Sequence, residues 1–163
     1  MILVLVEHDG QRVKRSSIAG VELARRLGGH LTGIATDSPF SLGTASVQFI
    51  GEADIRYVQE RAVEHHAACK RIFLDAMAAA DVPRLPRTDP GFGYDWIDRG
   101  PGAGLTIPEH ARVFDLTFVA RPGKDAASGQ AALLDECLFE SGRPVLVMPP
   151  AKAQDIGKHI VIA

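Results

Sequence analysis

Five apolar residues in a row, Ile2-Leu3-Val4-Leu5-Val6, stand near the start of the chain. An unbroken apolar run of this length is typical of a β-strand that is covered on both faces. A polar stretch, His8–Arg15, follows it and indicates a loop. Because such a strand needs helices above and below it, the run predicts an α/β protein.

Outward from this run, apolar segments alternate with segments of helical period. Further strands are predicted near Leu31–Ala35, at Leu85–Thr88, at Leu116–Ala120 and at Pro144–Met148. Helices are predicted from Ser16 or Ser17 as the cap to about Leu27, from about Glu52 to Ala80, over Pro108–Val113, and from Ser128 or Gly129 to Gly142. Thr36–Gly51 is rich in Ser, Gly, Thr and Pro, and Gly91–Gly104 contains five glycines and one proline, so both segments are predicted to be loops.

Strands that are separated by helices run parallel, with right-handed crossovers. We therefore expect a doubly wound α/β fold, with a parallel five-stranded sheet and helices on both faces. Ligands of such sheets bind outside the carboxyl ends of the strands, where the strand order reverses. The loops expected at this edge are His8–Arg15, Thr36–Gly51, Asp89–Gly104 and Arg121–Ser128.

Composition and charge exclude several classes of protein. The 163 residues suit one domain, and a net charge of −2 lacks the basic excess of nucleic-acid-binding proteins. No apolar run is long enough to span a membrane, and Met1–Val6 lacks the basic flank of a signal peptide. Cys69 and Cys137 are expected to be reduced core residues, so we expect a cytoplasmic protein.

Three segments together resemble the universal stress protein family. They are the opening ILVLVEHDG of residues 2–10, the stretch Ala111–Ala120 and the stretch Ser141–Pro150. Their order and spacing cover nearly the whole chain. The resemblance implies a five-stranded parallel sheet and, in many members, a homodimer. Some members bind ATP through an Asp after the first strand and a Gly-x2-Gly-x9-Gly-Ser/Thr loop after the fourth.

The loop after Val119 departs from this pattern. Ala120 stands at the first glycine position, Gly123 matches the second, and Ser128-Gly129 comes too early and in reverse order. Glycines let backbone amides approach phosphates, so their loss weakens a phosphate cradle. The resemblance implies that either Glu7 or Asp9 would occupy the family's acidic position, which faces the ribose. The candidate residues for binding ATP or AMP are Glu7, Asp9, Gly10, Ala35, Arg121, Gly123, Ser128 and Gly129.

Other polar groups do not form a recognisable catalytic or metal site. His65 and Cys69 share a helix face, but two ligands do not close a zinc site, and Cys69 falls on the apolar stripe. No nucleophile stands beside an evident base, so no catalytic residue is assigned. Trp96 lies between Asp95 and Asp98 in the predicted glycine-rich loop, where it either lines a ligand crevice or covers an apolar edge.

The end of the chain gives two expectations about assembly. Val145, Leu146, Val147 and Met148 resemble the edge strand through which many family members pair, so we expect a homodimer. Residues 1–150 form the domain, and 151–163 resemble a linker and the start of a second repeat. Within this tail, Ile160-Val161-Ile162 predicts an extra C-terminal strand that is ordered and paired.

Two functions fit these observations. The first is a dimeric binding or sensor module of the universal stress protein type, acting in stress response, with a degenerate nucleotide pocket. The alternative is an enzyme of the same fold that binds or hydrolyses ATP or AMP. The altered loop after Val119 favours the binding module over the enzyme.

Overall fold

The computed structural model describes residues 1–7, 10–36, 52–99, 105–122 and 128–149. Its strands are β1 (Ile2–Val6), β2 (His30–Ala35), β3 (Gly93–Ile97), β4 (Leu116–Ala120) and β5 (Val145–Met148). Its helices are α1 (Gly10–Leu27), α2 (Glu52–Ala79), α3 (Ile107–Ala111) and α4 (Ser128–Glu140). The predicted C-terminal strand at Ile160–Ile162 lies outside the described residues, as does the whole of the 151–163 tail.

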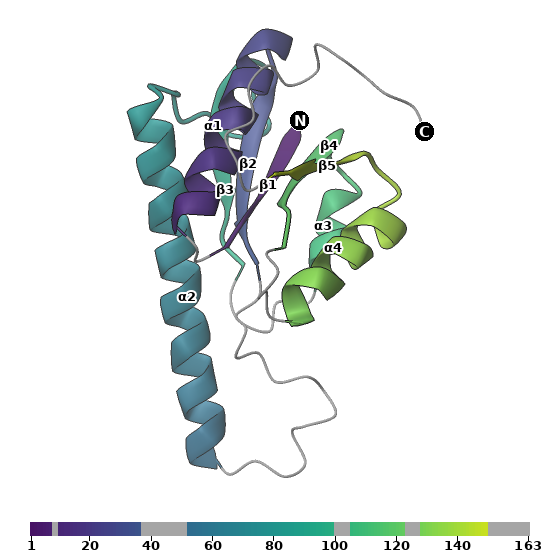
Figure 1. The fold of residues 1–163 in the computed structure, drawn as a ribbon. Helices are drawn as coiled ribbons and strands as arrows, with labels where there is room; N and C mark the ends of the chain where they lie inside the picture. Colours follow the sequence, from purple (N-terminus) through teal and green to yellow (C-terminus); the bar gives the residue numbers. More distant parts are fainter. Residues whose placement is uncertain (8–9, 37–51, 100–104, 123–127, 150–163) are drawn as a thin grey trace.

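The strands form one parallel sheet in the order β3-β2-β1-β4-β5 (Figure 1). β1 lies at the centre, with Val6 opposite Ala35 of β2 and Val4 opposite Phe118 of β4. Strand order therefore reverses between β1 and β4, because the chain leaves β1 toward β2 and β3 and returns on the other side. The prediction of a doubly wound five-stranded sheet is confirmed.

Helices cover both faces of the sheet and divide the core into two layers. Alternate residues of β1, including Val4 and Val6, pack with α1 and α2 around Phe73. Leu3 and Leu5 pack on the other face with α3, α4 and Phe114. Cys69 lies in the first layer and Cys137 in the second, and both thiols are free and buried, as predicted.

Helix α1 begins earlier than the sequence predicted. It starts at Gly10 and contains Ser16 and Ser17, which were expected to cap it. The arginines and lysine between residues 10 and 15 are good helix formers, so the helix continues through a stretch that looked like a loop. Its end agrees with the prediction, since Gly28 has φ +60° and the N–H of Gly29 donates to the carbonyl of Ala24.

The third strand lies later in the chain than the predicted Leu85–Thr88. β3 begins at Gly93, inside the segment that glycine content indicated to be a loop. The earlier segment runs beside β3 and makes one bridge, in which the N–H of Tyr94 donates to Pro83 and that of Leu85 to Tyr94. A Cβ at Gly93 would lie 2.5 Å from the Cβ of Leu85, so this close approach requires glycine.

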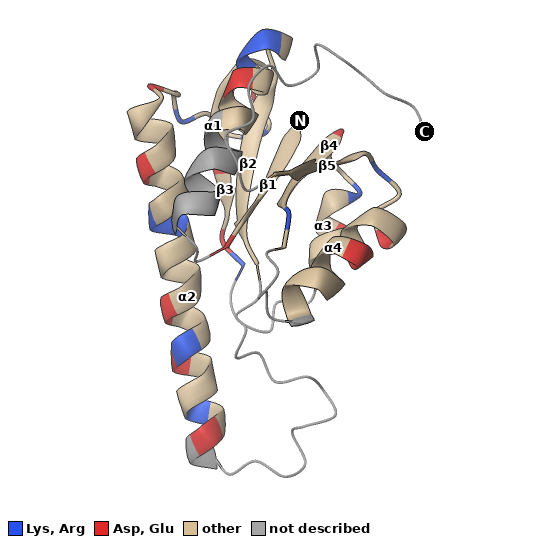
Figure 2. Ribbon diagram, viewed as in Figure 1, with Lys and Arg blue, Asp and Glu red and all other residues tan. Residues whose placement is uncertain are grey.

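The 28 residues of α2 make it much longer than the strands that it covers. At 1.5 Å per residue the helix is about 42 Å long, whereas a five-residue strand spans about 17 Å. Its amino-terminal half extends beyond the carboxyl ends of the strands (Figure 1), and acidic and basic residues alternate along its length (Figure 2). One wall of the carboxyl edge is therefore formed by α2.

The carboxyl end of α2 is closed by a residue in the left-handed region. Asp81 has φ +50°, and the N–H of Val82 donates to the carbonyl of Met77 at 3.1 Å. This is a Schellman arrangement, in which glycine is the residue that normally takes the left-handed position. Pro83 follows directly and prevents the helix from continuing.

We expect Asp81→Gly to raise the free energy of unfolding by about 0.5–1 kcal/mol, because glycine relieves the left-handed strain. Asp75→Gly is the matched control, since Asp75 is exposed inside α2 and its replacement should destabilise the helix by about 0.1–0.3 kcal/mol. Urea unfolding of both variants measures the two changes. Equal destabilisation by both variants would contradict the account of Asp81.

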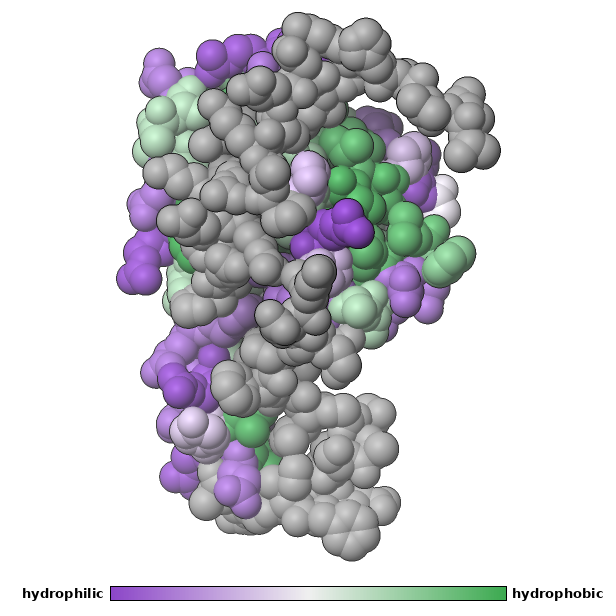
Figure 3. All heavy atoms as spheres, viewed as in Figure 1, coloured by the Kyte–Doolittle hydropathy of each residue, from purple (hydrophilic) through white to green (hydrophobic). Residues whose placement is uncertain are grey.

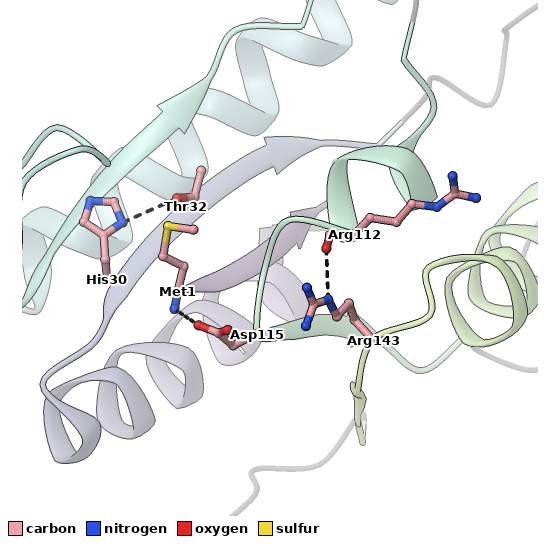
Figure 4. Close-up of polar contacts among 6 residues, drawn as sticks. All are labelled: Met1, His30, Thr32, Arg112, Asp115 and Arg143. Carbon is pink, nitrogen blue, oxygen red and sulfur yellow. Dashed lines mark hydrogen bonds and ion pairs between the residues drawn. The ribbon is translucent and has the colours of Figure 1, made fainter.

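Polar contacts tie the loops at the amino ends of the strands together (Figure 4). The N-terminal ammonium pairs with Asp115, and this bond lowers the pKa of the exposed Asp115 carboxyl. Arg143 Nε donates to the carbonyl of Arg112 at 2.9 Å. His30 contacts Thr32 on its own strand and the carbonyl of Leu85 at 2.8 Å. These contacts hold the amino edge of the sheet together. A ligand site is expected at the opposite edge, where the carboxyl ends of the strands lie.

Candidate functional site

Glu7 marks the point where strand order reverses. It follows β1 directly and is only 8% exposed. Gln130, in the first turn of α4, donates from Nε2 to Glu7 Oε2 at 3.1 Å. The contact joins residues 123 positions apart in the chain. It brings the acidic residue after β1 against the start of the helix after β4, as the fold rule for ligand sites requires.

The other predicted site residues occupy the same edge where they are described. Ala35 ends β2 and is buried, and Arg121 follows β4, is exposed, and donates its N–H to the carbonyl of Met148 at 2.8 Å. Gly10 opens α1, while Ser128 and Gly129 open α4. Asp9 and Gly123 lie outside the described residues. That these residues bind a nucleotide stays a prediction.

Two residues at this edge were missed by the sequence analysis. Thr36 is buried, and its N–H donates to the carbonyl of Val6 at 3.0 Å, which extends the pairing of β1 and β2 by one residue. Gln130 is the partner of Glu7. A polar residue in the first turn of the helix after β4 was the available signal for Gln130. Thr36 carried no such signal, because it looked like the first residue of a loop.

A second feature of the carboxyl edge is a cleft of about 290 Å³ beside β2 and β3. Helix α2 forms one wall, and the end of β3 with the residues after it forms the other. The lining residues are Ala35, Val63, His66, Ala67, Lys70, Trp96, Asp98 and Arg99. Trp96 lies in a strand rather than in the predicted loop, and it lines this cleft and packs against Phe73. That the cleft takes a ligand stays a prediction.

The histidines of α2 do not assemble a metal site in the part of the chain that the structure describes. His65 Nε2 lies 3.5 Å from Cys69 Sγ, and His66 Nδ1 lies 2.5 Å from the carbonyl oxygen of Arg99. No three His, Cys, Asp or Glu side chains gather there in a way that would hold a metal ion. Burial, helped by the charge of Glu7, raises the pKa of the Cys69 thiol to about 12, so this thiol is protonated at neutral pH.

This chain is similar to known proteins in structure, but no family model or curated protein matches its sequence. None of the described helices combines the length and the apolar character needed to cross a membrane.

Ten chains of solved structures resemble the fold, among them the two that follow. A universal stress protein from Archaeoglobus fulgidus has a TM-score of 0.46 and 16% sequence identity, with 90% of each chain covered. A protein from the universal stress protein family of Burkholderia pseudomallei has a TM-score of 0.46 and 18% identity, with 92% of this chain and 95% of that one covered. Both carry the name of the family that the three sequence segments resemble.

Proposed function

We propose that this chain is a binding or sensor module of the universal stress protein type, dimeric and cytoplasmic, with a nucleotide pocket that has degenerated. The observation that carries the proposal is the buried Glu7 carboxylate, which accepts a hydrogen bond from Gln130. In the ATP-binding members of the family that this chain resembles, a carboxylate at this position is expected to face the ribose. Here a ribose hydroxyl would have to compete with an amide that belongs to the protein.

The last residue of β4 supports the same proposal. Ala120, at the first glycine position of the nucleotide loop, is buried in the structure. A side chain at this position takes space that a phosphate-binding loop leaves open for backbone amides. Two elements of the pocket, the acid and the first glycine, therefore differ from what tight nucleotide binding needs.

We expect ATP with Mg²⁺ at about 1 mM to raise the melting temperature by no more than about 2 °C, since a millimolar Kd adds only about 0.4 kcal/mol. A micromolar Kd would add about 4 kcal/mol and raise the melting temperature by roughly 8–16 °C. A thermal-shift titration with ATP, AMP and Mg²⁺ separates the two cases.

Phosphate release in the same samples tests the enzymatic alternative. Turnover of ATP or AMP would favour an enzyme and contradict the proposal, as would ATP that copurifies with the protein. As a control, Gln130→Ala removes the side-chain amide that donates a hydrogen bond to Glu7. If the degenerate pocket is described correctly, this variant binds ATP at least as well as the unchanged protein.

The dimer is proposed through β5, which pairs only with β4 among the described strands and leaves its other edge open. Val145, Leu146 and Val147 remain half-buried on this strand. Nearby on α4, Phe139 is 83% exposed and Leu138 is also exposed. The surface view shows apolar residues gathered on the side where β5 and α4 lie (Figure 3). An open apolar edge of this kind favours association with a second copy.

We expect Val147→Lys to weaken the dimer at least about a hundredfold, because two-fold symmetry brings two buried ammonium groups together. Val147 suits this test since it belongs to neither packed core layer. Leu27→Lys is the matched control, because Leu27 is exposed at the end of α1 and should leave the dimer intact. Sedimentation velocity measures both. A monomeric unchanged protein at high micromolar concentration would refute the proposed dimer.

A further inference from the structure

The cleft beside Trp96 has one wall made by a single stripe of α2. Val63, His66, Ala67 and Lys70 stand at positions i, i+3, i+4 and i+7 and therefore share one helix face. This stripe begins where α2 passes the carboxyl end of β2, which Ala35 marks. The cleft has a volume of about 290 Å³, which is near the lower end for small-molecule pockets. It therefore suits a ligand with one ring or two fused rings.

The floor of the cleft is apolar and preformed. The indole of Trp96 lies over the backbone of Gly33, because a Cβ added to Gly33 would be only 2.6 Å from the indole carbon Cε3. The centroids of the Trp96 and Phe73 rings are 5.5 Å apart. These two contacts hold the indole in place while its remaining surface lines the cleft. Val63 on the opposite wall is 55% exposed although it is apolar. A flat apolar ligand would cover both side chains.

Polar contacts tie the two walls together at the rim. Lys70 Nζ donates to both carboxylate oxygens of Asp98, at 2.8 and 2.7 Å. His66 Nδ1 lies against the carbonyl of Arg99, and because a carbonyl oxygen only accepts, Nδ1 carries the proton. These links fix the walls before any ligand arrives, which lowers the ordering cost of binding.

The rim offers a hydrogen-bond donor to an anion. Lys70 is paired with Asp98, and Arg99 Nε donates to the carbonyl of Leu105 at 3.1 Å, so the donor that a ligand would meet belongs to Lys70. An ammonium has three N–H donors, and Asp98 takes two of those of Lys70, so one donor remains for a ligand. A ring on the floor with one carboxylate at the rim would match both the apolar and the charged parts.

We propose that this cleft binds a small aromatic monocarboxylate, with its ring against Trp96 and its carboxylate at Lys70. The site goes beyond the proposed function, because all of its residues except Ala35 lie outside the predicted nucleotide-binding set. It needs neither the loop after β4 nor the contact of Glu7 with Gln130.

Trp96 is the only tryptophan of the chain, so its indole N–H gives one assignable NMR signal that reports on the cleft. The probes are 2-naphthoate and its neutral analogue 2-naphthamide, each titrated into the ¹⁵N-labelled full chain. We expect 2-naphthoate to shift the Trp96 signal with a Kd of about 1 mM or below, and to bind about five- to tenfold more tightly than the amide.

Two pairs of α2 residues provide variants and controls. Ala67→Leu should abolish the shift by filling the cleft from its α2 wall, while Ala78→Leu on the same helix should not change it. Lys70→Gln should remove the preference for the carboxylate, whereas Arg71→Gln should keep it. An unmoved Trp96 signal, equal affinity for both probes, or equal effects of each variant and its control would overturn the proposal. ATP titrated into the same sample tests the nucleotide pocket separately, through the side-chain amide of Gln130.

Discussion

Replacing Gly33 by alanine should lower the free energy of unfolding by about 3 kcal/mol, because the centre of β2 has no room for a methyl group. Its Cβ would lie 2.6 Å from Trp96 Cε3 and 2.9 Å from Phe73 Cδ1. Real Cβ contacts are not this short, so the indole or the phenyl ring has to move. Phe73 is fully buried, and its displacement would disturb the layer packed by α1 and α2.

Urea unfolding of Gly33→Ala measures this loss, which corresponds to a fall in melting temperature of roughly 6–12 °C. Gly129→Ala is the control, because nothing lies within 4 Å of the added Cβ at the start of α4, and alanine favours the helix. The Trp96 indole signal should also move in Gly33→Ala. A stable variant with an unmoved indole would show that the close packing of Trp96 on β2 is described wrongly.

Raising the pH from 8 to 10 should destabilise the protein by about 2 kcal/mol for each of the two buried thiols. Burial raises the pKa of Cys69 to about 12 and that of Cys137 to about 11, whereas an unfolded thiol titrates near 8.5. The folded state thus keeps protons that the unfolded state releases. The stabilisation is complete below about pH 8.5 and is lost as the pH rises toward 11–12.

The comparison is made between the unchanged protein and a Cys69→Ala, Cys137→Ala double variant, both unfolded by urea at intervals from pH 7 to 10. Because the two proteins differ only at Cys69 and Cys137, the difference between the two curves reports the thiols. The double variant should be less stable at pH 7, since it loses buried volume, and the difference should shrink at pH 10. A constant difference would mean that the thiols ionise in the folded state as they do in the unfolded one.

Most of the sheet was predictable because its inner strands are short apolar runs with no competing signal. β1 and β4 are such runs, and their predicted limits agree with the structure. β3 was not predictable in this way, because Gly93 and Asp95 interrupt its pattern and neighbouring glycines suggest a loop. What makes it a strand is pairing with β2, in which Trp96 stands opposite Gly33, and this pairing is invisible in the local sequence.

The candidate site was likewise predictable from the sequence only in part. Glu7 was predictable, since a polar residue directly after a buried strand must lie at the carboxyl edge. Its partner Gln130 was not, because no local pattern connects positions so far apart. The cleft was anticipated only through Trp96, whose position beside α2 depends on how β3 packs.

The two ends of α2 are packed against the rest of the domain to different extents, so we expect them to differ in stability. From Ala62 onward the helix has buried side chains, among them Cys69, Phe73 and Met77, whereas Asp54, Arg56 and Tyr57 are exposed. Helical stability in proteins comes mostly from packing of one face, so the first turns should open at a lower free energy than the whole domain needs to unfold. The boundary between the two regimes falls at Val63 and His66, on the wall of the cleft. A ligand bound there would therefore stiffen the helix on its weaker side, and its arrival would be felt along the part of α2 that reaches beyond the sheet.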